Sequence, residues 1–210
     1  MCAHVVMVPQ MIIEEIVREI ERQNLANYLP DWPAVVQPDP KTLKSAFPKS
    51  PVPIILPDKE ARLTTKVMTW GYTVPWSKQV VFNTRFDTAT RPGKNMWAES
   101  LAERRCVVPT FGFYEPHKSE TFINPRSNRE NKQQYFFASP TSALLFIAGV
   151  FEGDQFSLMT TEPNGIMRPI HNRMPLVLEP DELDTWLFGE YLSLEDRSMI
   201  DIIATKSPAR

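Results

Sequence analysis

Cysteine and glycine are both scarce in this chain of 210 residues, which holds two cysteines and 7 glycines. Two cysteines exclude a disulfide framework, and their spacing matches no zinc site. Proline is abundant by contrast, at 20 residues, which favours rigid turns over long helices. No apolar run approaches the roughly 18 residues of a membrane helix, and no signal peptide is recognisable. We therefore expect a soluble protein of the reducing cytoplasm, with no membrane partner and no metal.

An excess of positive charge is also missing, because 23 Lys and Arg are offset by 25 Asp and Glu, giving a formal net charge of -2. The net charge of the molecule therefore does not attract nucleic acid, although a local basic groove is compatible with these numbers. A length of 210 residues with 42% hydrophobic residues suits one globular domain with a substantial core. We expect a single domain over residues 1–210.

Runs of short strands with few helices are the pattern of the chain, which predicts an α+β fold with a largely antiparallel sheet. Apolar residues at positions 12, 13, 16, 17 and 20 predict a helix over residues 11–23. Further helices are expected at residues 97–104, 181–187 and 193–203, the last leading into a tail within 190–210. Strands are expected at residues 5–8, 52–57, 63–74, 104–115, 135–139, 143–152, 156–161 and 174–178. Loops are expected at the Pro-rich segment 29–53, the polar segment 116–134 and the segment 162–173.

The β-prone stretch Arg104–Glu115, RRCVVPTFGFYE, is the segment around which we expect the fold to be organised. Pro109 cannot donate to a ladder, so we expect an edge or a bulge there. Gly112 allows the backbone to bend or a neighbour to approach closely. Glu115 lies where the apolar run stops, and a carboxylate close to a core tends to have a raised pKa and can carry protons. The alternative is a surface Glu at the end of a strand.

Cys2 is a candidate nucleophile because removal of Met1 would make it the first residue. Its α-amine, with a pKa of ~7.7–8.0, and its thiol, with a pKa of ~8.5, would then lie on adjacent carbons. The amine can condense with an aldehyde to an imine, and the thiolate can close a five-membered thiazolidine ring. The alternative is that Cys2 belongs to a frayed terminus. Cys106, within an apolar strand, is expected to be a buried core thiol.

Other candidate residues lie near strand ends. His171 lies in a loop, and histidine is the usual proton carrier near neutral pH. Asn83 can hold an oxygen or nitrogen through its amide, and Arg85 can clamp a phosphate, although both also suit a simple turn. Trp70 and Trp76 can stack on unpaired bases if they are exposed, or else belong to the core.

Taken together, these motifs stand in the order and approximate spacing of one family. The chain resembles the SOS-response-associated peptidase (SRAP) family, whose members crosslink to abasic sites in single-stranded DNA. The resemblance runs from residue 2 to about residue 190. It rests on Met1-Cys2, Trp70-Gly71, Pro75-Trp76, Asn83-Thr84-Arg85, the stretch Arg104–Glu115 and His171-Asn172-Arg173-Met174-Pro175.

The resemblance implies the SRAP fold, a single domain with a mostly antiparallel, barrel-like sheet and flanking helices. It implies Cys2 as nucleophile, Asn83 as the residue that positions the reacting sugar or ring, Glu115 as the carboxylate that moves protons, and His171 as the residue that assists sugar ring opening and crosslink reversal. The same resemblance implies DNA binding by Arg85, Arg173, Trp70 and Trp76.

Departures from the family pattern concern the residues around these positions. Ala3 and His4 stand where Gly and Arg are usual, so position 4 no longer offers a guanidinium to a phosphate. Asp87 stands where Glu is usual, and Pro116 replaces an aromatic residue after Glu115. The proposed catalytic residues themselves are retained.

The resemblance thus implies a sensor that traps abasic sites in single-stranded DNA through a thiazolidine at Cys2, a lyase-like crosslinking activity. The expected partner is single-stranded DNA with abasic sites, bound by a monomer without a cofactor and associated with the nucleoid when on DNA. One alternative is a thiol (auto)peptidase, a hydrolase that uses Cys2, His171 and Glu115. Another is a non-catalytic single-stranded DNA-binding protein that uses the arginines and tryptophans.

Overall fold

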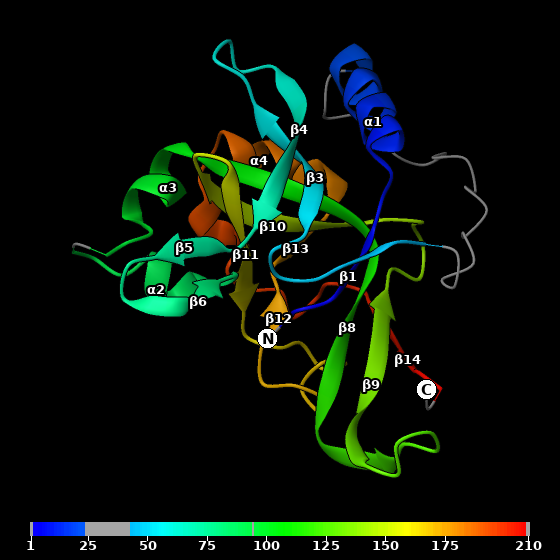
Figure 1. Ribbon diagram of the computed structural model, residues 1–210. Helices are drawn as coiled ribbons and strands as arrows, with labels where there is room; N and C mark the ends of the chain where they lie inside the picture. The colour runs from blue at the N-terminus through cyan, green and yellow to red at the C-terminus, as the bar shows by residue number, and fades with distance from the viewer. Residues whose placement is uncertain (1, 24–42, 94, 209–210) are drawn as a thin grey trace.

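The computed structural model describes residues 2–23, 43–93 and 95–208, and strands dominate this part of the chain (Figure 1). The strands are β1 (Val5–Met7), β2 (Ser45–Ala46), β3 (Pro51–Pro57), β4 (Leu63–Trp70), β5 (Tyr72–Val74), β6 (Ser77–Val81), β7 (Asn83–Arg85), β8 (Arg105–Ile123), β9 (Glu130–Ala138), β10 (Leu145–Glu152), β11 (Gln155–Thr161), β12 (Met174–Pro175), β13 (Val177–Leu178) and β14 (Ile203–Lys206). The helices are α1 (Gln10–Gln23), α2 (Phe86–Ala89), α3 (Ala98–Glu103) and α4 (Leu183–Leu187), with 3-10 turns η2 (Pro180–Glu182) and η3 (Tyr191–Leu194).

The main sheet closes on itself. β8 pairs with β10, β10 with β11, β11 with β4, β4 with β3, and β3 again with β8. β11 runs parallel to β4 and to β7, whereas the other pairings among the described strands are antiparallel. The expected α+β class with a mostly antiparallel, barrel-like sheet is therefore confirmed. No helix in the described ranges is long and apolar enough to cross a bilayer.

β8 contributes side chains to both hydrophobic clusters, as do β1, β3, β4, β10 and β11. Successive side chains of a strand point to opposite faces, so Val107 joins one cluster while Cys106 and Val108 join the other. Cys106 is fully buried, as expected of a core thiol. The helix expected at 11–23 is confirmed as α1, which packs on β3 and β4. It buries the apolar stripe Ile13, Ile16, Val17 and Ile20.

The irregularity expected at Pro109 lies two residues further along β8. Val6 faces Gly112 and Met7 faces Thr110, so the register between β1 and β8 shifts across Phe111. Gly112 has a φ of 154°, and a Cβ there would lie 2.4 Å from the carbonyl oxygen of Phe137. Only glycine therefore allows β9 to approach β8 this closely.

The prediction of a polar loop at 116–134 is wrong. β8 continues to Ile123, and β9 begins at Glu130, so these residues form a long two-stranded ribbon (Figure 1). The ribbon projects from the closed part of the sheet, with many exposed residues on both strands. It therefore carries little of the apolar alternation by which a half-buried strand is recognised in a sequence.

The helix predicted at 193–203 is wrong as well. A short 3-10 turn ends at Leu194, and β14 then pairs with β9. Tertiary contacts hold the intervening chain, because Asn164 Nδ2 donates to Ile200 O at 2.9 Å and Arg197 pairs with Glu182 at 2.6 Å. These contacts override the weak helical pattern.

Other strand predictions are confirmed in position, with changed limits. The run 63–74 is divided at Gly71, where φ is 112°. The segment 174–178 is divided into β12 and β13. Gly153 and Asp154 form the hairpin turn that joins β10 and β11, and the segment 162–173 is a loop, as expected. Most of the connection predicted at 29–53 lies outside the described residues, and its end forms β2 and the start of β3.

Candidate functional site

Cys2 is fully buried, and a residue far along the chain fixes its backbone. Asn83, at the start of β7, donates from Nδ2 to the carbonyl oxygen of Cys2 at 2.8 Å, across 81 positions of sequence. The Cys2 thiol itself lies 3.9 Å from the carbonyl oxygen of His4, a weak hydrogen bond. Burial raises the pKa of this thiol above its ordinary value, and the charge of Glu115 adds to the effect. The thiol is therefore held in its protonated form until something removes its proton.

Asn83 also has an acceptor that the protein does not use. Its Oδ1 atom is buried, and no hydrogen-bond partner for it exists among the described residues. Leaving a buried amide oxygen unpaired costs about 1–3 kcal/mol. Such an atom beside Cys2 is well placed to accept from a bound molecule.

Glu115 and His171 lie close together in the candidate site. The side chain of Glu115 is 0% exposed, and its Oε2 atom lies 4.0 Å from Nε2 of His171. Burial raises the pKa of Glu115 to about 7. The pKa of His171 is lowered by its own burial, against which a hydrogen bond with the Arg173 backbone acts. A carboxyl group with a pKa near neutrality exists in both protonation states, so it can give and take protons.

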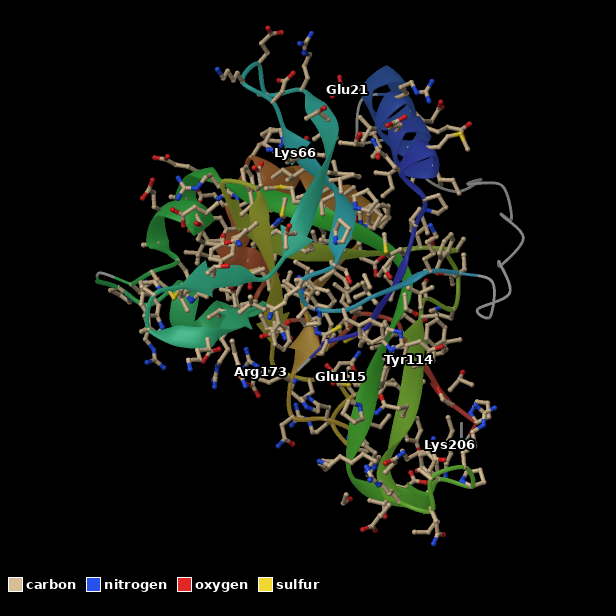
Figure 2. All side chains as sticks on the ribbon, in the orientation of Figure 1. Glu21, Lys66, Tyr114, Glu115, Arg173 and Lys206 are labelled. Carbon is tan, nitrogen blue, oxygen red and sulfur yellow. The ribbon has the colours of Figure 1, made fainter. Side chains whose placement is uncertain are left out.

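The Arg173 backbone orients the imidazole of His171. Nδ1 of His171 lies 3.0 Å from the carbonyl oxygen of Arg173 and 3.2 Å from its amide nitrogen. This leaves Nε2 as the nitrogen directed at Glu115. Figure 2 shows Glu115 on β8, with Arg173 on the loop before β12.

Arg173 is buried and is engaged by two carboxylates. Its guanidinium contacts Glu162 at 2.6 Å and Asp87 at 3.0 Å, and it donates to the carbonyl oxygen of Thr160 at 2.8 Å. Arg85 is half exposed and pairs with the same Asp87 at 2.7 Å. The motifs indicated both arginines but not the acids that hold them. The spacing Arg85-Phe86-Asp87 was the signal in the sequence that could have revealed the ion pair between Arg85 and Asp87.

The two tryptophans occupy opposite environments. Trp70 is 0% exposed, packs beside Phe156 and Phe82, and donates from Nε1 to the carbonyl oxygen of Phe82. Its assignment to a DNA-facing surface is therefore wrong, because the ring has no free face. Trp76 is 69% exposed, between β5 and β6, so its assignment to a DNA-facing surface stays a prediction.

His4 adopts a role that the family pattern did not suggest. Its ring stacks between Phe47 and Tyr114, at centroid distances of 4.4 Å to each, and Nε2 lies 2.7 Å from Ser45 Oγ. The carbonyl oxygen of His4 also accepts from the Tyr114 amide at 2.9 Å. The imidazole that replaces the usual arginine thus packs the chain next to Cys2 against β8.

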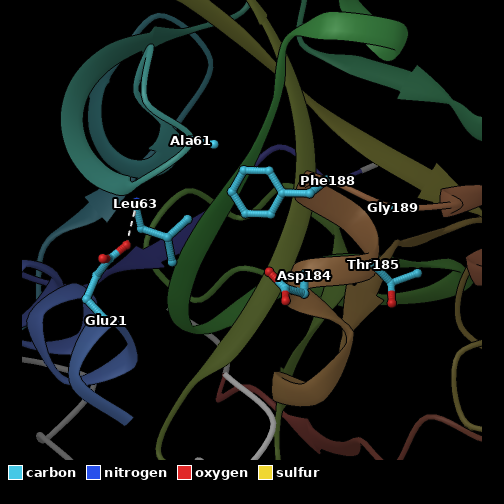
Figure 3. A pocket seen from close by; sticks show the side chains of 7 residues that line it. All are labelled: Glu21, Ala61, Leu63, Asp184, Thr185, Phe188 and Gly189. Atoms are coloured by element: carbon cyan, nitrogen blue, oxygen red, sulfur yellow. Dashed lines mark hydrogen bonds between the residues drawn. The ribbon is translucent and has the colours of Figure 1, made fainter. Parts of the chain in front are cut away.

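Of the hollows that the described residues line, one lies beside His4 and another lies away from the predicted site residues. One of about 480 Å³ opens along the ribbon and is lined by His4, Tyr114 and Lys132, among others. The other, of about 630 Å³, lies between α1, the β3–β4 turn and α4 (Figure 3). Figure 3 shows Glu21 there, whose carboxylate accepts from the Leu63 amide at 2.7 Å. None of the predicted site residues lines the second hollow.

Comparison with known proteins agrees with the sequence pattern. Residues 1–206 match the family model described as SOS response associated peptidase (SRAP). The chain therefore belongs to the SRAP family.

Named relatives share part of their length with this chain. Abasic site processing protein YoaM of Bacillus subtilis is 31% identical over 136 residues, which cover 57% of this chain and 55% of that protein. Abasic site processing protein HMCES of Xenopus tropicalis is 27% identical over 198 residues, covering 76% of this chain and 58% of that protein. The chain thus spans little more than half the length of these relatives.

Solved structures share the fold along nearly the whole chain. A crystal structure of a protein from Bacteroides thetaiotaomicron superposes with a TM-score of 0.69 at 20% identity, covering 99% of this chain and 92% of that one. The crystal structure of a phage-related protein from Bordetella bronchiseptica gives a TM-score of 0.68 at 18% identity, covering 98% of this chain and 94% of that one. These likenesses support the fold.

Proposed function

We propose that this protein processes abasic sites in single-stranded DNA by bonding covalently to them through Cys2 after loss of Met1. Membership of the SRAP family and the names of its relatives, abasic site processing proteins, support the DNA lesion as the target. The observation that carries the proposal is the hydrogen bond from Asn83 to the Cys2 carbonyl, which fixes the second residue of the chain in a buried site. Glu115 belongs to the same site, because its charge raises the pKa of the Cys2 thiol.

The reaction needs an aldehyde, an amine and a thiol. The open form of an abasic sugar carries an aldehyde at C1′, and the Cys2 amine adds to it. Loss of water gives the imine, and addition of the sulfur to the imine carbon, with transfer of the thiol proton, closes the thiazolidine ring. The net change is formation of one C–N bond and one C–S bond with release of one water molecule.

The proposed roles follow from protonation states and positions. Glu115, with its pKa raised to about 7 by burial, protonates the departing hydroxyl group and later takes the thiol proton. His171 protonates the sugar ring oxygen during opening, and the free Oδ1 of Asn83 accepts from the sugar or the amine. Because the thiol acts second, a raised thiol pKa is compatible with this order of events.

The family's description as peptidases keeps a thiol peptidase as the second candidate, with Cys2 as nucleophile. A peptidase needs its thiolate at the first step. The buried Cys2 thiol, with its raised pKa, favours the amine-first reaction instead. A non-catalytic single-stranded DNA-binding protein, the third candidate, would use Arg85 and Arg173, yet both are paired with Asp87.

Denaturing gels with an abasic oligonucleotide test the proposal. The parent protein is expected to form a heat-stable conjugate, whereas Cys2→Ala forms none that survives heating. Cys106→Ala is the matched control, because it removes the other buried thiol and should crosslink like the parent. Equal yields of stable conjugate from Cys2→Ala and the parent protein would show that the proposed chemistry is wrong. Peptide turnover without DNA would favour the peptidase.

A further inference from the structure

The charges around the predicted DNA-binding arginines cancel. Arg85 and Arg173 pair with Asp87, and Arg173 also pairs with Glu162. Two guanidinium groups thus face two carboxylates, so this side of the site has little net attraction for a phosphate. A DNA strand held at the site needs cations from elsewhere.

Cations without an ion-pair partner lie near His171, where the ribbon meets the 162–173 loop. The Lys118 amide donates to the carbonyl oxygen of Ile170 at 2.8 Å, and Lys118 Nζ donates to that of Arg168 at 2.9 Å. Lys132, on β9, is exposed and pairs in register with Thr121 of β8. Within the part of the chain that the structure describes, Lys118, Lys132 and Arg168 form no ion pair with a carboxylate.

Acidic residues on the same ribbon are engaged elsewhere. Glu120 accepts from the Tyr135 hydroxyl at 2.7 Å and pairs with Lys206, and Glu130 accepts from the Thr121 hydroxyl at 2.7 Å. Among the described residues, neither of these carboxylates forms an ion pair with Lys118, Lys132 or Arg168.

The ammonium groups lie within electrostatic range of the site. Besides its burial, the charges of Lys132 and Lys118 lower the pKa of His171. The charges of both lysines therefore act on the imidazole of His171. One backbone hydrogen bond, from the Lys118 amide to Ile170, and one from the Lys118 side chain to the Arg168 carbonyl join the loop carrying His171 to the ribbon.

We infer that Lys118, Lys132 and Arg168 form a phosphate-binding shelf that holds the DNA backbone on the ribbon side of the lesion. The inference rests on the proposed function and adds to it a second, cationic wall of the site. Lysine binds a phosphate as a point charge and reads no base. The shelf therefore positions any sequence equally, as a lesion sensor requires.

Salt dependence of binding is the direct test. The affinity for an unmodified single-stranded oligonucleotide is measured over a range of salt concentrations for the parent, Lys132→Ala and the pair Lys118→Ala with Lys132→Ala. For single strands, log K decreases with log salt, and the steepness of this decrease is reduced by about 0.7 for each phosphate that the protein no longer neutralises. We expect that change for Lys132→Ala and about twice that change for the pair.

Lys59→Ala is the matched control. Lys59 is an exposed lysine in the β3–β4 turn, at the opposite end of the molecule from the tip of the ribbon (Figure 1). It should bind DNA with the slope of the parent. Because Lys118 also holds the loop through hydrogen bonds, Lys118→Arg is included as a variant that keeps the charge. Its slope should equal that of the parent.

The outcomes separate the shelf from the chemistry. Slopes of the lysine variants equal to that of Lys59→Ala would overturn the shelf, even if the parent crosslinks abasic DNA. Reduced slopes with a parent that forms no crosslink would support the shelf and overturn the proposed reaction. A parent that binds no single-stranded DNA would overturn both.

Discussion

The amide of Asn83 donates to the backbone carbonyl of Cys2 at 2.8 Å, while its own oxygen has no partner among the described residues. One side chain thus fixes the proposed nucleophile through its donor and presents an acceptor to whatever binds there. Only an amide can do both, since an ionised carboxylate has no hydrogen-bond donor and an alkyl group has neither a donor nor an acceptor.

Asn83→Asp is therefore expected to impair crosslinking more than it impairs folding. The carboxylate would place an acceptor against the Cys2 carbonyl and release the start of the chain. We expect the crosslinking rate to fall by at least about tenfold, with a loss of about 1–3 kcal/mol in the free energy of unfolding. Single-turnover crosslinking and urea denaturation measure the two effects. A normal rate in a destabilised variant would contradict the positioning role.

The raised pKa of Glu115 predicts a pH dependence of stability. The folded protein keeps its proton up to a pKa of about 7, whereas the unfolded chain releases it near the ordinary value of 4.5. Between these values the native state binds more protons, so the free energy of unfolding falls as pH rises. The contribution is up to about 3 kcal/mol, since each unit of pKa is worth about 1.4 kcal/mol. Glu115→Gln should remove this slope, as denaturation at several pH values would show.

The same group predicts a pH limit on the reaction. Crosslinking should decline as pH rises through about 7, because Glu115 then loses the proton that it donates. Glu115→Gln should be slow and lack this alkaline decline. A parent profile that rises steadily to alkaline pH would exclude Glu115 as the acid.

Gly112 and Gly153 form a matched pair for testing the closeness of β8 and β9. Both have positive φ values, 154° and 58°. A Cβ at Gly112 would lie 2.4 Å from the Phe137 carbonyl oxygen, whereas one at Gly153 would meet nothing within 4 Å. Gly153→Ala should cost about 1 kcal/mol of unfolding free energy, and Gly112→Ala clearly more. Similar costs in thermal or chemical denaturation would show that the strands are not tightly packed there.

Trp70 and Trp76 should respond in opposite ways to substitution. Trp70→Ala removes a fully buried side chain and should cost about 3–5 kcal/mol of unfolding free energy. Trp76→Ala should leave stability nearly unchanged and weaken binding to single-stranded DNA, by about 1–3 kcal/mol if the ring stacks on a base. Unchanged DNA binding in Trp76→Ala would remove this residue from the proposed interface.

Local patterns predicted much of the fold. The apolar spacing of α1 and the β-branched runs of β3, β4, β10 and β11 carry their own periodicity, so their elements were found. The ribbon after Glu115 was missed because it projects with many exposed residues, and β14 was missed because its partner, β9, is far away in sequence. Closure of the sheet between β8 and β10 likewise depends on contacts that no local pattern encodes.

The motifs predicted which residues belong to the candidate site, but not which acids surround Arg173. The positions Cys2, Asn83, Glu115 and His171 came from their motifs, and hydrogen bonds or short distances link Cys2 with Asn83 and Glu115 with His171. The environment of Arg173 could not be predicted, because the acids that hold it lie on separate segments. Burial of Trp70 was equally hidden, since tryptophan suits both a core and a DNA-binding surface.

Intact-mass analysis of the protein before and after incubation with an abasic oligonucleotide tests the central claim most directly. The account predicts a mature chain that lacks Met1 and a product whose mass equals protein plus oligonucleotide minus one water molecule. A protein that retains Met1, or a product bonded at any residue other than Cys2, would contradict it.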